Sequence, residues 1–207
     1  MNAHSNNRVA VVGNVVSGFT YSHESHSEKF YSCTLAIERT SGTKDYLPII
    51  VSEKLIDIKS TYENDIICVI GQIRSYNQPD NDKKKLLLYL FAFEFYATDS
   101  GYMNDVCVEG YICKQPTYRV TPFGRTIADL LIAIPRYCGK SDYIPVVCWG
   151  RSATFASRLE IGQCVTVSGR MQSREYQKCI NDETITKIAY EVSVININII
   201  DKDIKYA

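Results

Sequence analysis

The segment DYIPVV at Asp142–Val147 matches the segment DYLPII at Asp45–Ile50, and 97 positions (142 minus 45) separate the two. The same offset aligns further short segments: Thr20–Tyr21 with Thr117–Tyr118, Leu35–Arg39 with Ile132–Arg136, and Gly13 with Gly110. After a shift of one residue, Val69–Ile73 aligns with Val167–Met171. So many agreements at one offset indicate an internal repeat. We conclude that the chain contains two copies of one module, which meet near Thr98–Gly101.

Each copy has the sequence pattern of a small β-rich domain. Runs such as Cys164–Ser168 alternate with the period of two that is typical of a half-buried strand. One helix is expected between the third and fourth strands of each copy. In the second copy Ser152 is a candidate N-cap and Gly162 a candidate stop. In the first copy Ser52 and Asn64 take these places. This order of elements is the layout of an OB-fold, a five-stranded Greek-key barrel.

We therefore predict an all-β protein of two tandem OB-fold barrels, each with one short helix between strands 3 and 4. The expected boundaries are 1–98 for the N-terminal barrel, 99–105 for a linker, 106–195 for the C-terminal barrel and 196–207 for a C-terminal extension. Gly71 and Gly169 fall within strands, where a small barrel needs a bend or a close backbone approach. Two small β-sandwich domains are the weaker alternative, because they do not account for one helix at a fixed place.

The composition excludes several classes of protein. Hydrophobic residues make up 45% of the 207 residues, and the 23 basic residues balance the 23 acidic ones, so the chain is not disordered. No stretch approaches the roughly 20 apolar residues that span a bilayer, and the polar residues 1–7 do not resemble a secretory signal. We expect a cytoplasmic protein that does not interact with membranes.

Patterns typical of enzymes and metal proteins are also missing. The sequence contains no H-E-x-x-H, G-x-S-x-G or phosphate-loop motif. The 8 cysteines are scattered and show no C-x-x-C spacing, and the 3 histidines lie near the start of the chain. Buried free thiols that pack as small hydrophobic groups explain this distribution best. We predict no enzymatic activity, no cofactor and no metal.

The charged residues are unevenly distributed between the copies. Residues 1–101 contain 10 Lys and Arg against 12 Asp and Glu, whereas residues 102–207 contain 13 against 11. Between Tyr111 and Arg174 basic residues alternate with aromatic ones, the combination that binds single-stranded nucleic acid through phosphate contacts and base stacking. The competing interpretation is that Trp149 and Tyr143 pack in the core and that the arginines form a solvated face.

Parts of the sequence resemble the bacterial single-stranded DNA-binding protein family. The similar segments are Val108–Ile112, Pro116–Arg125, Asp142–Arg151 and Ile161–Tyr176. The resemblance covers most of residues 106–195 and is fainter in residues 8–96. It implies that bases stack on Tyr143, Trp149 and Tyr176, and that phosphates contact Arg119, Arg151 and Arg174. In the first copy it extends to Arg8 and Tyr46.

Our complete set of candidate DNA-binding residues adds the neighbouring basic and aromatic side chains Tyr118, Arg125, Arg136, Tyr137, Arg74 and Tyr76. The first copy departs from the family pattern, because Ser52 replaces Trp149 and Gln78 replaces Tyr176. We therefore expect the first barrel to be the weaker DNA-binding barrel.

The sequence thus predicts a protein that binds single-stranded DNA without strong sequence preference, in replication, recombination or repair. The alternative is an assembly protein, similar to primosomal or phage-encoded OB proteins, that acts mainly through protein contacts. RNA binding uses the same stacking and also stays open. The expected partners are single-stranded DNA and a second copy of the chain, giving a nucleoid-associated homodimer with four barrels. Replication proteins are possible partners, although Asn196–Ala207 lacks the family's acidic recruiting tail.

Overall fold

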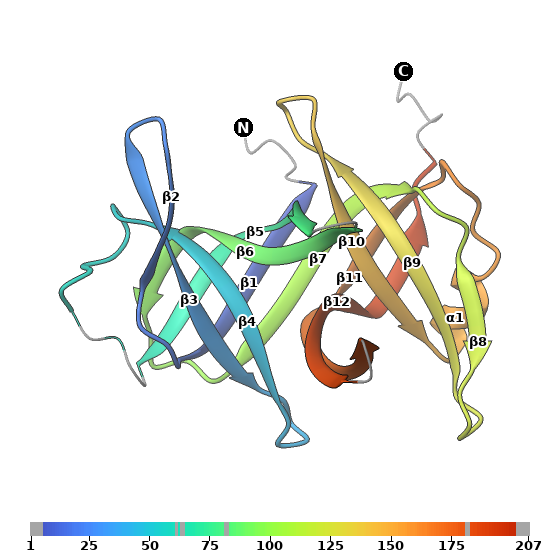
Figure 1. Ribbon diagram of the computed structural model, residues 1–207. Helices are drawn as coiled ribbons and strands as arrows, with labels where there is room; N and C mark the ends of the chain where they lie inside the picture. The colour runs from blue at the N-terminus through green and yellow to red at the C-terminus, as the bar shows by residue number, and fades with distance from the viewer. Residues whose placement is uncertain (1–5, 61, 63–64, 81–82, 181–182, 202–207) are drawn as a thin grey trace.

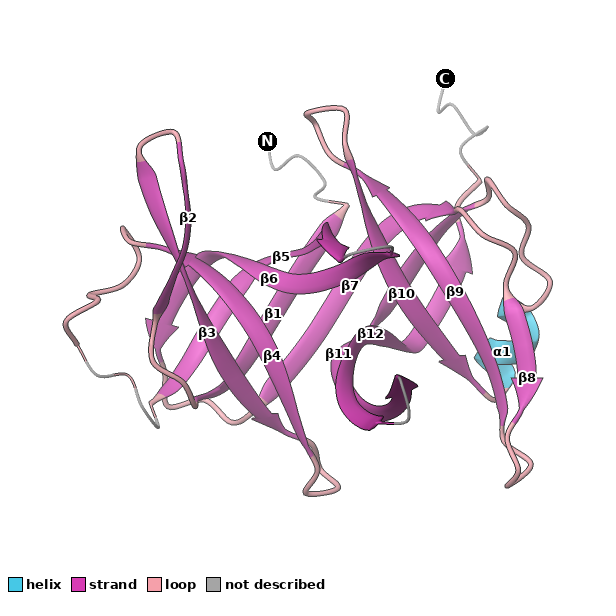
Figure 2. Ribbon diagram, viewed as in Figure 1, coloured by secondary structure: helices cyan, strands magenta, loops and turns pink. Residues whose placement is uncertain are grey.

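The computed structural model describes residues 6–60, 62, 65–80, 83–180 and 183–201. Figures 1 and 2 show its elements: β1 (Asn7–Val15), β2 (Thr20–Ser25), β3 (Glu28–Glu38), β4 (Lys44–Ser52), β5 (Ile66–Asp80), β6 (Lys83–Ala97), β7 (Met103–Ile112), β8 (Thr117–Val120), β9 (Thr126–Pro135), β10 (Ser141–Trp149), α1 (Arg151–Ala156), β11 (Cys164–Ile180) and β12 (Glu183–Ile199). The protein is all-β. Within the described residues, no helix has the length and hydropathy that crossing a bilayer requires.

The strand order divides the chain into two equivalent halves. The sheet has the order β2-β3-β4-β6-β5-β1-β7-β11-β12-β10-β9-β8, in which the second half repeats the first in reverse. An additional pairing of β3 with β1 closes the first half into a ring of five strands, and the pairing of β9 with β7 closes the second. The strands β2 and β8 form hairpins with β3 and β9. The internal repeat predicted from the sequence is therefore present in the fold.

The strands β1 and β7 join the two barrels side by side (Figure 1). They pair antiparallel from Asn7 opposite Val108 to Val12 opposite Met103. Because β1 and β7 are equivalent strands of the repeat, this pairing relates the barrels by an approximate two-fold rotation. The segment between β6 and β7 spans residues 98–102, and the first residues of β7 already pair with β1. Backbone hydrogen bonds thus unite the two barrels into one continuous sheet.

Two glycines mark the places where the backbones of neighbouring strands approach most closely. A Cβ atom added at Gly71 would lie 2.0 Å from the carbonyl oxygen of Phe91, and one at Gly169 would lie 2.2 Å from that of Ser193. Both positions adjoin a β-bulge, so the predicted close approach is confirmed. At the second bulge, Ile195 is left without a partner and β12 then continues to Ile199. The expected extension from residue 196 therefore begins inside the last strand.

The helices differ from the prediction. Helix α1 begins after Gly150, which has a φ of 56°, and not at the proposed cap Ser152. It ends at Ala156, well before Gly162, the proposed stop. In the first copy the chain forms turns over 53–60, so the expected helix is absent from these residues. The Ser52 hydroxyl accepts from the backbone N–H of Lys54 at 3.1 Å, as a capping residue does, and donates to the Glu28 carboxylate on β3, yet only turns follow it. Asn64 lies outside the described residues.

The two halves contribute equivalent aliphatic side chains to the buried core. Leu35, Leu47 and Ile67 are fully buried in the first barrel, and Ile132, Ile144 and Val165 occupy the matching places in the second. Burial of each such side chain stabilises the fold by about 1.5–3 kcal/mol. Two free thiols, Cys33 and Cys148, are buried as well, and burial raises the pKa of each to about 12. These thiols pack as small hydrophobic groups, as the sequence predicted, but Cys107 and Cys138 are exposed, so the prediction is wrong for those two.

Candidate nucleic-acid interface

A groove between the barrels gathers several of the predicted residues. Its lining residues come from both halves of the chain: Arg39, Thr43, Arg125, Trp149, Arg170, Gln172, Ser173, Arg174, Glu175 and Ser193. We call it the Trp149 groove, and its volume is about 560 Å³. The first barrel contributes the 39–43 turn between β3 and β4, and the second contributes β10, β11, β12 and the turn before β9. The groove therefore requires both barrels.

The strand β10 presents two aromatic rings on the outer face of the second barrel. Tyr143 and Trp149 are six positions apart and so share a face of the strand, at a separation of roughly 20 Å. Their side chains are 40% and 41% exposed, while Ile144, Val146 and Cys148 on the opposite face are buried in the core. The core-packing interpretation of these two rings is therefore wrong. Gly150 at positive φ then turns the chain from β10 into α1.

Four guanidinium groups line the Trp149 groove. Arg39 is anchored by Asp45, with Nε–Oδ2 and Nη2–Oδ1 distances of 2.7 and 2.5 Å, and this hydrogen bonding raises the pKa of Arg39. Arg174 Nε lies 3.5 Å from Glu191 Oε1. Among the buried side-chain nitrogen and oxygen atoms of the described residues, Nε of Arg170 alone lacks a hydrogen-bond partner. A buried donor without an acceptor favours binding of an anion.

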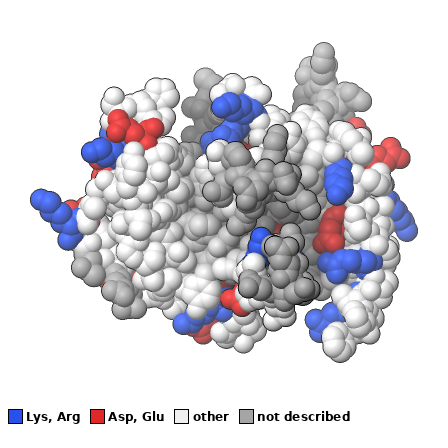
Figure 3. Space-filling view, viewed as in Figure 1, with Lys and Arg blue, Asp and Glu red and all other residues white. Residues whose placement is uncertain are grey.

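Four other predicted residues of the second barrel are not among the lining residues of this groove. Arg119 on β8 is half-exposed and donates to Asp129 at 2.9 Å, a hydrogen bond that raises the pKa of Arg119. Tyr118 is exposed on the alternate side of β8, and Tyr176 is exposed on β11 beyond Arg174. Arg151 is exposed at the first position of α1. On the face shown in Figure 3, Lys and Arg side chains gather over the second barrel, whereas the surface over β3 and β4 is mostly uncharged.

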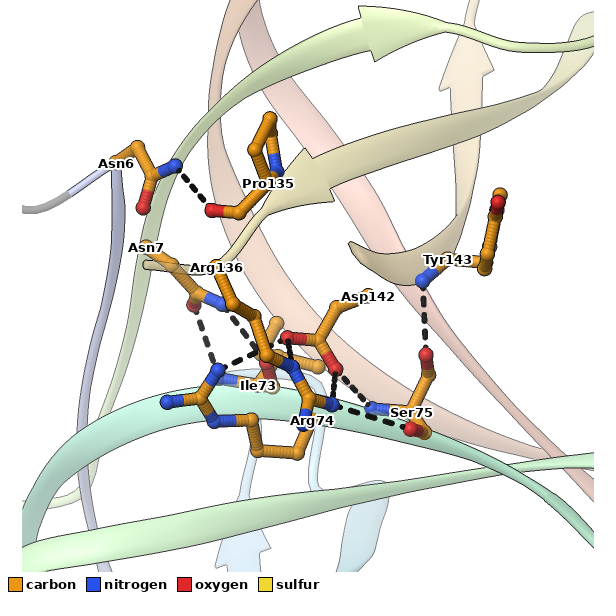
Figure 4. A network of polar contacts seen from close by, with 9 residues as sticks. All are labelled: Asn6, Asn7, Ile73, Arg74, Ser75, Pro135, Arg136, Asp142 and Tyr143. Atoms are coloured by element: carbon orange, nitrogen blue, oxygen red, sulfur yellow. Dashed lines mark hydrogen bonds and ion pairs between the residues drawn. The ribbon is translucent and has the colours of Figure 1, made fainter. Parts of the chain in front are cut away.

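Two of the predicted arginines contact an acidic residue between the barrels. Arg136 donates to both carboxylate oxygens of Asp142, with an Nε–Oδ2 distance of 2.6 Å, and Arg74 Nη1 donates to Oδ2 at 3.1 Å (Figure 4). Asp142 is fully buried, and hydrogen bonding to it raises the pKa of Arg136. Arg74 thereby joins the first barrel to the second, and Arg136 does the same through its Nη2, which donates to the Ser75 carbonyl oxygen at 3.3 Å. Tyr137 is 96% exposed, next to them at the turn between β9 and β10.

The first barrel has a different surface at the place equivalent to the Trp149 groove. Ser52 replaces Trp149 and Glu28 replaces Arg125, and the two are hydrogen-bonded to each other. Lys54 Nζ lies 2.7 Å from Glu28, and the hydrogen bonds from Lys54 and Ser52 lower the pKa of Glu28. In the first barrel the charge of Glu28 is thus neutralised by Lys54, whereas the equivalent positions of the second barrel expose an arginine and an indole.

The first barrel also has a largely apolar pocket, which we call the His23 pocket. Its volume is about 510 Å³, and it is lined by Ser22, His23, Ile50, Tyr76, Leu87 and Tyr89. The imidazole of His23 stacks on Phe30, with ring centroids 4.9 Å apart. Burial is the main cause that raises the pKa of Tyr89. Of these residues only Tyr76 was predicted.

The remaining predicted residues of the first half are Tyr46 and Arg8. Tyr46 on β4 is 46% exposed and is the counterpart of Tyr143. Arg8 is exposed on β1, opposite Cys107 of β7, and thus lies on different strands from those that line the Trp149 groove.

Sequence reasoning missed Arg39 and Arg170 as lining residues of the Trp149 groove. Arg170 shares its strand face with Arg174 because the two are four positions apart on β11, so strand periodicity could have identified it. Arg39 belongs to the other half of the chain, and only the docking of the barrels brings it to this groove.

The chain is similar to known proteins over one or both of its halves. The family model described as the single-strand binding protein family matches residues 103–200. Single-stranded DNA-binding protein 1 of Clostridium acetobutylicum is 32% identical over 98 residues, which are 43% of this chain and 89% of that protein. The single-stranded DNA-binding protein of Clostridium tetani is 34% identical over 82 residues, 36% of this chain and 57% of that protein. The chain spans little more than half the length of several such relatives.

Both halves together match a solved structure. Wild-type single-stranded DNA-binding protein from Thermus aquaticus superimposes with a TM-score of 0.76 over 95% of this chain and 93% of that chain, at 17% sequence identity. This similarity shows a shared fold across the full two-barrel arrangement. Together with the sequence match to the Clostridium acetobutylicum protein over most of its length, it leads to one conclusion: the chain belongs to the single-strand binding protein family.

Proposed function

We propose that the protein binds single-stranded DNA without strong sequence preference and without catalysis. The observation that supports this most directly is the Trp149 groove, in which a half-exposed indole lies among four guanidinium groups. Flat rings stack on any base and arginines contact any phosphate, so this combination is tolerant of sequence. The relatives named as single-stranded DNA-binding proteins support the same assignment. They do not favour the assembly-protein alternative.

The closed five-stranded rings support the interpretation of each half as an OB barrel, with the boundary between them at residues 98–102. OB barrels bind their ligands on the outer face of the strands and adjoining loops, which is where Tyr143 and Trp149 lie. Because the matching place in the first barrel holds Ser52 and Glu28, we propose that the second barrel contributes more to DNA affinity.

Binding of a labelled oligo-dT tests this function. We expect wild-type protein to bind, with log K falling linearly as log salt rises. At matched stability, Tyr143→Ala should lower the affinity more than Tyr46→Ala, because Tyr143 shares its strand face with Trp149. A protein that assembles with itself or with others but does not bind oligo-dT would refute the proposal. Binding to an RNA oligomer of the same length tests the preference for DNA.

We also propose that the chain works as a homodimer with four barrels, in replication, recombination or repair near the nucleoid. A row of apolar side chains crosses the outer face of the central strands; it is exposed at its two ends and buried at Cys68 and Val12 in its middle. Tyr96, Cys68, Val12 and Met103 lie directly opposite one another on β6, β5, β1 and β7, and Tyr96 and Met103 are exposed. Covering such a row is the usual role of a subunit interface. Light scattering should give about 47 kDa, twice the 23.5 kDa of one chain, and Met103→Glu should shift the mass toward one chain.

A further inference from the structure

The two exposed tyrosines predicted to stack bases are each attached to the other barrel through the backbone. The N–H of Tyr143 in the second barrel donates to Oγ of Ser75 in the first barrel at 2.8 Å (Figure 4). The N–H of Tyr46 in the first barrel donates to Oγ of Ser173 in the second at 2.9 Å. The two contacts are related by the approximate two-fold rotation between the barrels. Each is the counterpart of the other.

A buried carboxylate completes each contact. The N–H of Ser75 donates to Asp142 Oδ1 at 2.6 Å, and the N–H of Ser173 donates to Asp45 Oδ1 at 2.9 Å. Each serine therefore accepts from the tyrosine N–H and donates to the preceding aspartate. Both aspartates are fully buried and held by arginine, so neither can turn away without losing charged hydrogen bonds. The pair of hydrogen bonds fixes the position and direction of the Asp-Tyr backbone.

The rings themselves are left free for a ligand. Tyr46 and Tyr143 are 46% and 40% exposed, and in Figure 4 the ring of Tyr143 points away from the polar network. A stacking ring on a backbone that is held in place loses less conformational freedom on binding, which increases affinity. An arrangement that fixes the main chain and exposes the ring is therefore suited to base stacking.

We propose that Ser75 and Ser173 are positioning residues for DNA binding, each of which sets the stacking tyrosine of the opposite barrel. This inference rests on the proposed function. The strands that provide the serines also face the ligand surfaces, because Tyr76 lines the His23 pocket and Arg174 lines the Trp149 groove. A nucleic acid that shifts β5 or β11 thus acts on the tyrosine of the other barrel. The two barrels are thereby linked through their binding surfaces.

The test is a double-mutant cycle measured by oligo-dT binding. Ser75→Ala removes the acceptor of the Tyr143 N–H, and loss of one such hydrogen bond should weaken binding about threefold to tenfold. In a Tyr143→Ala background the same change should have little effect, because no ring remains to be positioned. In a Tyr46→Ala background its full effect should persist. Ser75→Thr, which keeps the hydroxyl, should bind like wild type.

Controls separate positioning from folding. Ser168→Ala on β11 is a matched loss of one hydroxyl outside the contact, and urea unfolding of every variant measures its stability. If Ser75→Ala weakens binding equally in the wild-type and Tyr143→Ala backgrounds, its role is structural and the inference is wrong. If Ser75→Ala binds like wild type while Tyr143→Ala does not, the inference is also wrong. If wild-type protein does not bind oligo-dT at all, the proposed function itself fails.

Discussion

Replacing Trp149 by alanine removes the only tryptophan of the chain from the Trp149 groove. Stacking of a base on an aromatic side chain contributes ~1–3 kcal/mol, so the Kd for oligo-dT should rise about 5-fold to 150-fold. The side chain is 41% exposed, and loss of a fully buried Trp costs about 3–5 kcal/mol. Because about three-fifths of the Trp149 side chain is buried, we expect Trp149→Ala to lower the unfolding free energy by about 2–3 kcal/mol. A variant with that loss remains folded at 25 °C if the wild type has ordinary stability.

Fluorescence anisotropy of a labelled dT oligomer at fixed salt measures the affinity, and urea unfolding measures the stability. Tyr21→Ala is the matched control, because Tyr21 is an exposed aromatic residue on β2 that does not line the groove. Trp149→Phe, which keeps a ring, should lose less affinity than Trp149→Ala. In the wild type, oligo-dT should quench the tryptophan emission. The stacking role would be refuted if Trp149→Ala bound oligo-dT as tightly as wild type. It would also be refuted if the loss of affinity were no larger than the unfolded fraction of the variant explains.

Three further outcomes follow from the charged and buried groups. Arg170→Ala and Arg174→Ala should each reduce the slope of log K against log salt by roughly 0.7; an unchanged slope in a titration from low to high salt would exclude phosphate contacts by that residue. Asp142→Asn should lower the unfolding free energy by about 3–5 kcal/mol, since two arginines are left near a buried neutral group. Asp45→Asn should lower it less, because one arginine contacts Asp45. Equal losses in urea unfolding would contradict this difference. The pKa of the Cys148 thiol is raised from 9.0 in the unfolded reference to about 12. Burial of the neutral thiol therefore contributes its full stability below pH 9, and this contribution falls as the pH rises toward 12, by up to about 1.4 kcal/mol per pH unit. Cys148→Ala should for this reason flatten the alkaline decline in melting temperature.

Much of the fold could be predicted because its signals are local in the sequence. Apolar residues that alternate along β7 and β11, and glycines such as Gly71 and Gly169, report the strands and their close approaches within a few residues. The helix expected after Ser52 failed for the opposite reason. The Ser52 hydroxyl does accept from the Lys54 N–H as a cap would, but the chain continues in turns, and its second partner Glu28 lies 24 positions earlier, where no local pattern reveals it.

The same difference between local signals and long-range contacts explains which residues of the candidate site could be predicted. Trp149 and Arg174 could be identified because strand periodicity and the family resemblance agree on them. Arg74 and Arg136 look like phosphate-binding residues in the sequence, yet both contact Asp142. Arg136 reaches Asp142 within its own β9–β10 hairpin, whereas the contact of Arg74 exists only once the barrels have docked. Arg39 reaches the Trp149 groove through the same docking. Contacts between the halves are where reasoning from one residue at a time fails.

The unequal surfaces of the two barrels have a consequence for strand polarity. A nucleic acid strand has a direction, from 5′ to 3′, and a surface with perfect two-fold symmetry presents the same groups to a strand and to its reverse. Identical subunits around a two-fold axis therefore cannot distinguish the two directions. In this chain the positions related by the approximate axis hold Trp149 and Ser52, and Arg125 and Glu28. A strand that crosses both barrels of one chain meets these groups in a different order when it is reversed. Duplication within one chain therefore allows each chain to favour one direction, whereas a path across both chains of the proposed homodimer is two-fold symmetric again.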